Sequence, residues 1–313
     1  MRVLFFGYSQ AGYRTVELLA ERRSQGDEVV GVVTHRDDPA ENRWYHTPAE
    51  AALAHSLPLF YDEELGKDGI VDLAVQLAPD LVLSVFYRHI LPDAVLASAR
   101  LAALNLHPSL LPAYRGRAPL NWVLVNGEAE TGVTLHHMVR RADAGDIVAQ
   151  RAIPIAPRET ALTLYHKIEE AGVELLRETL PLVASGTASR LPQDESRASK
   201  VGRRRPEDGR IDWSWPAARV DCLVRAVAPP WPGAFFDLTD PSGVAGAAGA
   251  AAHRVFLHAG EPAEAFPEGS ERPAPGTVHR DGERTFIAAA DRWYRVDEAV
   301  GLDAQPRTDE DLK

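Results

Sequence analysis

The chain has 313 residues, and its 45 Asp and Glu against 34 Lys and Arg give a formal net charge of −11. Because phosphate backbones repel such a chain, its composition argues against a nonspecific nucleic-acid binder. With 45% hydrophobic and 25% charged residues, it resembles an ordinary soluble protein of about two domains. The single cysteine, Cys222, excludes an internal disulfide framework and a cysteine-only metal site, which is typical of a reducing compartment.

The N-terminal segment MRVLFFGYSQAG has neither the longer apolar stretch nor the cleavage site of a signal peptide. No segment of the sequence approaches the roughly 20 unbroken apolar residues that a membrane helix needs. We therefore expect a cytoplasmic protein without a membrane partner.

Apolar runs alternate with amphipathic segments through the first part of the chain. The patterns predict strands at 2–6, 29–35, 57–61 and 81–86, and helices at 12–20, 47–56, 70–78 and 160–183. Continuous apolar strands alternating with helices are typical of a parallel sheet that is covered on both faces. The sequence predicts an α/β fold with an N-terminal, Rossmann-like, doubly wound parallel sheet.

The hydrophobic period disappears between residues 184 and 210, where the sequence is polar and charged. Beyond that segment we expect a helix at 216–227, followed by short β-prone runs that predict a small, bent sheet or barrel. The Ala/Gly tract at 243–252 is expected to be a surface loop. The predicted division is an α/β domain at 1–188, a linker at 189–205 and a smaller β-rich, OB-like domain at 206–313.

The glycines of GYSQAG, Gly7 and Gly12, follow the first predicted strand. Such a turn either presents backbone amides to an anion or closes a strand-helix unit without any ligand, and both readings stay open. The spacing does not match GxGxxG, and Thr34-His35-Arg36 stand where a dinucleotide fold would place an acidic residue. An NAD-linked oxidoreductase is therefore disfavoured.

The stretch LNLHPSLLPAYRGRAPLNW, residues 104–122, fits no core-packing pattern. Asn105 and His107 alternate at a predicted strand end, so both side chains are expected on one face. An amide donor beside an imidazole is suited to stabilising an oxyanion and moving a proton, although such a pair also occurs as a purely structural hydrogen bond. The Pro-, Gly- and Arg-rich residues that follow indicate an ordered loop beside this pair.

A second polar segment, TGVTLHHMVRRADAGDIVAQ at 131–150, begins as an alternating strand and then turns. A turn that brings Asp143 against His107 would orient the imidazole and raise its pKa, whereas an Asp143 that caps its own turn would not. His136 and His137 are strand neighbours that face opposite ways. We therefore expect them to be half-buried residues and expect no metal site.

Together these segments resemble the formyltransferase family that uses N10-formyltetrahydrofolate. The resemblance rests on Asn105-Leu-His107, SLLPAYRG, ETGVTLHHM and Asp143-Ala-Gly, and on DGRIDWSWP and RAVAPPWPGAFF in the second domain. It extends over essentially the whole chain. Three segments, at 87–90, 115–122 and 139–145, are most similar to the module that formylates UDP-4-amino-4-deoxy-L-arabinose in the bifunctional polymyxin-resistance enzymes. That enzyme's decarboxylating module has no counterpart in this sequence, so we expect another polypeptide to supply the amino sugar.

The resemblance implies a catalytic set of Asn105, His107 and Asp143, which act on an amine of a nucleotide-linked sugar. It implies that folate lies along His89, Ile90, Leu91, Val139, Arg140, Arg141, Ala142 and Asp143. Arg117, Tyr114 and Ser109 are the expected substrate contacts. The implied partners are N10-formyltetrahydrofolate and the amino sugar, with no metal, and an oligomer is compatible with the pattern.

Two other enzymes that act on the formyl group of formyltetrahydrofolate remain as alternatives. A binding module without catalytic activity is the third alternative. A methionyl-tRNA formyltransferase must grip an acceptor stem, and the short basic run at 202–205 lies in an acid-rich context. A formyltetrahydrofolate hydrolase would use the same three residues on water.

The loop after His107 needs a sharp reversal at Leu110-Leu111-Pro112. Proline is the residue at which a cis peptide bond costs about 0.5–1 kcal/mol instead of several. Together with the resemblance, this predicts a cis Leu111-Pro112 bond, with Ser109 and Tyr114 on either side of the catalytic face.

Overall fold

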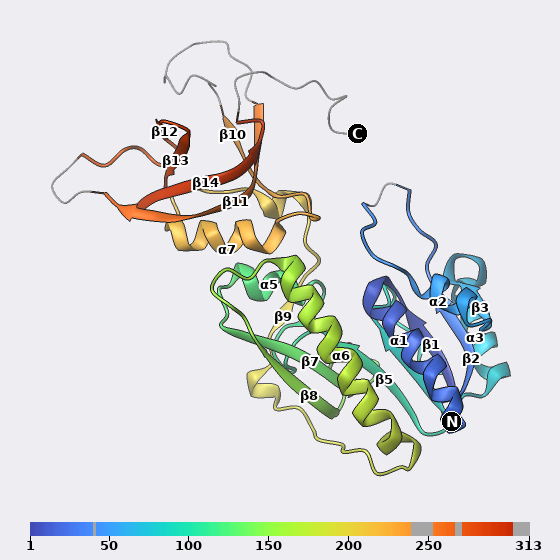
Figure 1. Cartoon of the computed structure of the whole chain (residues 1–313). Coiled ribbons are helices and arrows are strands. Elements are labelled where there is room, and N and C mark those ends of the chain that lie inside the picture. Colours follow the sequence, from blue (N-terminus) through green and yellow to red (C-terminus); the bar gives the residue numbers. More distant parts are fainter. Residues whose placement is uncertain (40–41, 239–252, 267–270, 303–313) are drawn as a thin grey trace. The chain divides into compact units, whose positions relative to one another are not determined.

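The computed structural model describes residues 1–39, 42–238, 253–266 and 271–302 (Figure 1). These residues form two compact units, of which the first comprises 1–119, 130–155 and 165–202, and the second comprises 120–129, 156–164 and the residues from 203 onward. The Ala/Gly tract at 243–252 lies outside the described residues.

A seven-stranded sheet forms the first unit, with the order β3-β2-β1-β4-β5-β7-β8. The parallel strands are β1 (Arg2–Gly7), β2 (Glu28–Thr34), β3 (Leu59–Tyr61), β4 (Leu81–Val85) and β5 (Ala102–His107). Beside them, β7 (Glu130–His137) pairs antiparallel with β5, and β8 (Ile147–Pro154) pairs antiparallel with β7. The predicted α/β class is confirmed. The sheet is mixed, however, because β7 runs in the direction opposite to β5, its neighbour.

Helices cover both faces of the parallel strands. The helices α1 (Ser9–Glu21) and α2 (Pro48–Ala54) contact β2 and each other, whereas α3 (Asp62–Leu77) contacts α4 (Asp93–Ser98). Leu4 and Phe6 of β1 are fully buried in a cluster with Ile70 and Ala74 of α3. Burying each such large side chain contributes about 1.5–3 kcal/mol. The predicted helix at 70–78 is therefore the C-terminal part of a longer element, which begins at Asp62 and is interrupted by Gly66 at a φ of 60°.

The long helix α6 (Ala161–Ala184) agrees with the predicted helix at 160–183. A Cβ atom on Gly172 would lie 2.8 Å from Leu106 Cδ2, so α6 packs closely on the Leu106 face of β5. Because side chains alternate along a strand, Asn105 and His107 lie on the opposite face. The polar side chains at the end of β5 therefore do not face α6.

Among the described residues of the first unit, two short strands lie outside this sheet. β6 (Arg115–Gly116) pairs in parallel with β9 (Lys200–Val201), which belongs to the predicted linker. The predicted linker at 189–205 is thus part of the first unit as far as residue 202. Short 3-10 helices lie at Arg22–Gln25 and Glu195–Arg197, and another, Pro206–Gly209, lies in the second unit.

The second unit contains α5 (Pro119–Val125), α7 (Ala217–Val227) and a five-stranded antiparallel sheet of order β10-β11-β14-β13-β12. Its strands are β10 (Ala234–Leu238), β11 (His253–Ala265), β12 (Val278–Asp281), β13 (Arg284–Ala288) and β14 (Arg292–Val300), and they lie in the region where the sequence predicts short β-prone runs. Figure 1 shows α7 lying along this sheet, where it contacts β11 and β14. Trp213, Phe236 and the fully buried Tyr294 form an aromatic group in its core.

Within the described ranges, no helix combines the length and the apolar character that crossing a membrane requires.

Candidate active site

The polar end of β5 lies against β7. In this antiparallel pair Asn105 is opposite His136, and His107 is opposite Thr134. Directly opposed residues share one face of a sheet, so four polar side chains line the same side of these two strands. The expectation that Asn105 and His107 share a face is confirmed.

His107 is buried, with an exposed fraction of 4%. Its Nε2 lies 2.9 Å from the carbonyl oxygen of Tyr114. A carbonyl oxygen only accepts hydrogen bonds, so Nε2 carries a proton and Nδ1 is the basic nitrogen of the neutral ring. The Nδ1 atom is 3.6 Å from Asp143 Oδ1.

Asp143 lies in the turn after β7, in a left-handed conformation with a φ of 56°. Its Oδ2 accepts a hydrogen bond from the Gly116 amide at 2.9 Å, and its Oδ1 is 3.6 Å from both His107 Nδ1 and His136 Nε2. The carboxylate therefore faces two imidazoles and does not cap its own turn. The sequence left both placements open, and the structure favours the one against His107.

The pKa values of this pair follow from burial and charge. Burial lowers the pKa of His107 below its ordinary value, and the nearby charge of Asp143 offsets this only in part. Asp143 thus raises the pKa of His107 as expected of a carboxylate in this position, but burial has the larger effect and the net shift is downward. Burial alone would raise the pKa of Asp143, but His136, the charge of His107 and the Gly116 amide outweigh it and hold that pKa at about 2.

The expectation that His136 is half-buried is wrong. His136 is almost fully buried, at 1% exposure, and its Nε2 lies 3.1 Å from Asn105 Nδ2. It therefore contacts both Asn105 and Asp143. The alternation of β7 places either His136 or His137 on the active face, and only the strand register decides which one.

The loop that follows His107 is held by internal hydrogen bonds. Ser109 is fully buried, and its hydroxyl donates to the carbonyl oxygen of Ala113 at 2.7 Å. The predicted role of Ser109 as a substrate contact is therefore not supported, because its side chain supports the loop from inside. The Leu111-Pro112 peptide bond is cis, as predicted. Tyr114, also predicted to contact substrate, is partly buried and has a φ of 60°.

Two loops that were predicted to bind folate expose apolar side chains. Ile90 is 78% exposed and Val139 is 42% exposed, whereas Leu91 is buried in the core cluster of α3 and α4. Leu91 can therefore reach a ligand only through its backbone. On the second loop Arg140, Arg141 and Ala142 are exposed, and Arg141 pairs with Glu195 at 3.0 Å. The predicted substrate contact Arg117 is exposed and donates from Nη2 to the Arg88 carbonyl oxygen at 2.8 Å.

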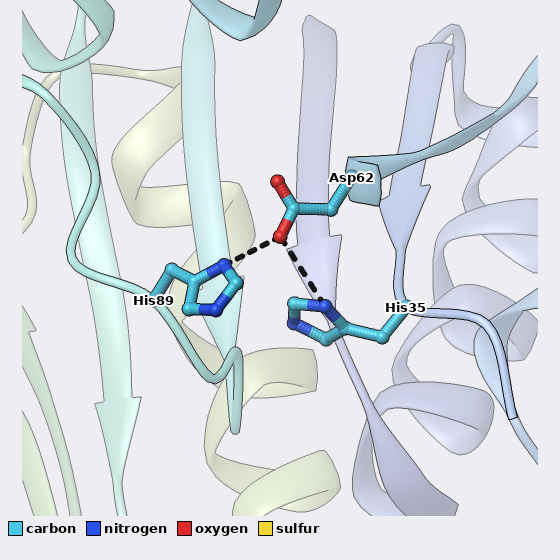
Figure 2. A group of neighbouring side chains, drawn as sticks. All are labelled: His35, Asp62 and His89. Atoms are coloured by element: carbon cyan, nitrogen blue, oxygen red, sulfur yellow. Dashed lines mark hydrogen bonds and ion pairs between the residues drawn. The ribbon is translucent and has the colours of Figure 1, made fainter. Parts of the chain in front are cut away.

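His89 belongs to a second polar cluster at the carboxyl edge of the parallel strands. Figure 2 shows His35, after β2, and His89, after β4, both directed at Asp62 at the start of α3. Asp62 Oδ2 lies 2.5 Å from His89 Nδ1 and 3.3 Å from His35 Nδ1. Within the described chain this is the one such trio spaced closely enough for a shared metal ion.

The hydrogen bonds of this trio favour a proton-sharing cluster over a metal site. The Arg88 amide donates to His35 Nε2 at 3.3 Å, which assigns the proton of a neutral His35 ring to Nδ1, facing Asp62. A metal ion at that Nδ1 would displace the proton to Nε2, where it would oppose the Arg88 N–H. Asp62 thus anchors His89, whose side chain remains 64% exposed.

The first glycine-rich turn is explained by packing. A Cβ atom on Gly12 would lie 2.8 Å from Pro48 Cγ, and one on Gly7 would lie 2.3 Å from Phe5 Cζ. Both glycines are therefore needed for the approach of α1 to α2 and for the end of β1, whether or not an anion binds at the turn.

Two family models match the chain. A model described as formyl transferase matches residues 1–180, and one described as formyl transferase, C-terminal domain, matches residues 203–305. The α/β unit with its Asn, His and Asp cluster and the antiparallel unit are thus those of a group-transferring enzyme. The chain belongs to the formyl transferase family.

Solved structures share this fold over nearly the whole chain. An N-formyltransferase from Helicobacter canadensis, in complex with folinic acid and dTDP-3-aminofucose, is 16% identical with a TM-score of 0.67, and the match covers 95% of this chain and 99% of that one. WlaRD, a sugar 3N-formyltransferase crystallised with dTDP and 5-N-formyl-THF, is 15% identical with a TM-score of 0.65, covering 96% and 98%. HypX from Aquifex aeolicus, in complex with tetrahydrofolic acid, is 23% identical with a TM-score of 0.61, covering 96% of this chain and 44% of HypX.

Proposed function

We propose that this enzyme transfers the formyl group of N10-formyltetrahydrofolate to the amine of a nucleotide-linked amino sugar. UDP-4-amino-4-deoxy-L-arabinose is the first candidate substrate. The observation that carries the proposal is the cluster of Asn105 and His107, at the carboxyl end of β5, with Asp143, in the turn after β7, in a chain of the formyl transferase family. The named ligands of two proteins with the same fold, a dTDP-linked amino sugar and a formylated folate, support this substrate class.

Asn105 is assigned the role of oxyanion donor. When the amine nitrogen attacks the formyl carbon, the carbonyl oxygen becomes a developing oxyanion, which a preorganised N–H stabilises. One hydrogen of Asn105 Nδ2 is directed at His136 Nε2, 3.1 Å away. The second hydrogen of the same nitrogen points away from His136 and is the one we assign to the oxyanion.

His107 is assigned the proton transfer. The attacking amine must lose a proton, and N10 must gain one before the carbon-N10 bond breaks. One group that accepts the first proton and donates it to N10 therefore ends the cycle unchanged. The basic Nδ1 of His107 accepts the amine proton directly or through water, and Asp143, 3.6 Å away, stabilises the imidazolium. His107 then returns the proton to N10, which releases tetrahydrofolate and the sugar formamide.

The folate is assigned to the two loops at 89–91 and 139–143. The exposed side chains of Ile90 and Val139 offer apolar contacts to a flat ring, and the backbone of these loops offers donors and acceptors to its polar edge. Arg117, anchored on the Arg88 carbonyl beside the first loop, is assigned to the nucleotide sugar. Tyr114 remains a second proposed substrate contact.

A panel of UDP-, dTDP- and GDP-linked amino sugars, each incubated with N10-formyltetrahydrofolate, tests the substrate class. The expected result is a mass increase of one formyl group on at least one sugar, with UDP-4-amino-4-deoxy-L-arabinose giving the highest kcat/KM. Saturable formylation of charged initiator tRNA with no sugar product would replace the proposal by methionyl-tRNA formylation. Folate-dependent release of formate without any amine would indicate the hydrolase.

A further inference from the structure

The segment at 191–201, which we call the strap, joins the two catalytic loops although both lie far earlier in the chain, with Gln193 50 residues after Asp143 and 78 after Arg115. Leu191 pairs with Ile147 after the Asp143 turn. Ser199 accepts a hydrogen bond from the Tyr114 amide through its side chain and from the Arg115 amide through its carbonyl. The strap therefore touches both the loop after β5 and the turn after β7.

Gln193 links the two loops through its side chain, whose amide uses both ends. Its Nε2 donates to the carbonyl oxygens of Asp143 at 2.8 Å and Gly145 at 2.7 Å. Its Oε1 accepts from Arg115 Nε at 3.1 Å and from Arg115 Nη2 at 2.6 Å. Because two carbonyls face one end and a guanidinium faces the other, the amide has a single favourable orientation.

Arg115 completes the connection to the carboxylate. Its side chain is buried, with Glu195 as its ion-pair partner at 2.7 Å. The next residue, Gly116, donates its amide to Asp143 Oδ2. Gln193 thus holds the backbone of Asp143 from one side while the residue that follows Arg115 holds its side chain from the other.

The Asp143 turn needs such support. Asp143 has a φ of 56°, in the left-handed region that non-glycine residues occupy at a conformational cost. A left-handed turn residue persists where the surrounding structure fixes it. The two carbonyl oxygens that Gln193 binds lie on this residue and two residues beyond it.

We propose that Gln193 is a positioning residue for formyl transfer, which holds the Asp143 turn so that the carboxylate faces His107. This inference rests on the role of Asp143 in the proposed function. Gln193 acts only through Asp143.

The substitution Gln193→Glu tests the two donated hydrogen bonds selectively. It keeps the length of the side chain and the partner of Arg115, but it places an oxygen against the two carbonyl oxygens. The expected result is a fall in kcat of about tenfold, the scale of losing one or two buried hydrogen bonds. Gln193→Met, which removes both the donors and the acceptor of Arg115 without adding a charge, is expected to lower kcat at least as much. The matched control is Ser196→Ala, an exposed strap position whose hydroxyl donates to Asp194, and it is expected to keep wild-type kcat.

A double-mutant cycle with Asp143→Asn separates positioning from a general structural role. If Gln193 acts through the Asp143 charge, adding Gln193→Met to Asp143→Asn causes little further loss of kcat, because the charge to be placed is already gone. Losses that multiply in the double variant would overturn the proposal. So would a Gln193→Met enzyme with wild-type kcat.

A substrate-free measurement keeps this test independent of the sugar assignment. The groups that face the His107 ring are Asp143, His136 and the Tyr114 carbonyl. NMR titration of His107 in the folded enzyme should give a lower pKa in Gln193→Met than in the wild type, in the same direction as in Asp143→Asn. An unchanged His107 titration in Gln193→Met would contradict the inference even if no sugar in the panel were formylated. A lower pKa with no sugar turnover would instead overturn only the substrate assignment.

Discussion

Asn105 and His136 form a hydrogen bond across β5 and β7, with Asn105 Nδ2 3.1 Å from His136 Nε2. His136 Nδ1 lies 2.9 Å from the carbonyl oxygen of His137, and because that oxygen only accepts, Nδ1 carries the proton. Nε2 of the neutral ring is therefore an acceptor, so the side-chain nitrogen of Asn105, and not its oxygen, faces His136. In the opposite orientation the Asn105 oxygen and Nε2 would place two lone pairs against each other.

Replacing His136 by Phe should lower kcat about tenfold, because the buried Asn105 amide loses the acceptor that orients it. The KM values for folate and sugar should change by less than this. His136→Gln, which can restore an acceptor, should recover part of kcat. His137→Ala is the matched control, since its side chain faces away from Asn105, and an equal loss of kcat in that variant would argue against the orientation role.

Asn105→Ala and His107→Ala should each lower kcat by roughly 10² to 10³, the scale of losing an oxyanion donor or a general acid-base group. Folate binding, measured by fluorescence or calorimetry, should remain within a few-fold of the wild type. Either variant retaining near wild-type turnover with normal folate binding would remove that residue from the mechanism.

The pH dependence of kcat/KM should have an acidic limb below pH 6.5. Burial lowers the pKa of His107, so the neutral, proton-accepting ring persists below its ordinary titration range and is lost only at lower pH. Asp143, with a pKa of about 2, stays ionised throughout. Its charge raises the pKa of His107, so Asp143→Asn should move the acidic limb to still lower pH. A limb that moves upward in Asp143→Asn would contradict this electrostatic relationship.

Gly116→Ala should destabilise the protein by roughly 1–3 kcal/mol, the range of substitutions that strain or overpack a site. Gly116 has a φ of 109°, and a Cβ atom there would lie 2.2 Å from the Val201 carbonyl oxygen. This crowding would push β6 away from its partner β9. Because the Gly116 amide also holds Asp143, kcat should fall as well. Gly186→Ala is a suitable control, since Gly186 has a φ of 71° with open space around it, and chemical unfolding of both variants separates crowding from the conformational penalty.

The strands β1, β2 and β4 of the parallel sheet could be predicted from the sequence because each of them is a continuous apolar run. The strands that end near Phe6, Thr34 and Val85 could be predicted without knowing which strands they pair with. The same holds for α6, whose apolar residues keep a helical period over many turns. Asn105, His107 and Asp143 were singled out through the resemblance to the formyltransferase family, because the residue pattern alone left a purely structural role open for each of them.

The relationships that the sequence did not reveal depend on pairing between distant segments. His136 reaches Asn105 only through the antiparallel register of β5 and β7, which a pattern of alternation leaves undetermined. The strap at 191–201 carries no hydrophobic period, since it binds largely through backbone groups and through Gln193. The sign of the His107 pKa shift likewise depends on how deeply the ring is buried, which the neighbouring residues alone do not define.

Following the formyl group itself tests the central claim most directly. The enzyme is incubated with N10-formyltetrahydrofolate labelled with carbon-13 at the formyl carbon, with and without UDP-4-amino-4-deoxy-L-arabinose, and the label is located by NMR. The account predicts that the label appears as a sugar formamide at the rate at which tetrahydrofolate forms, and that His107→Ala abolishes most of this transfer. Label that appears as formate at the same rate with and without the amine would contradict it.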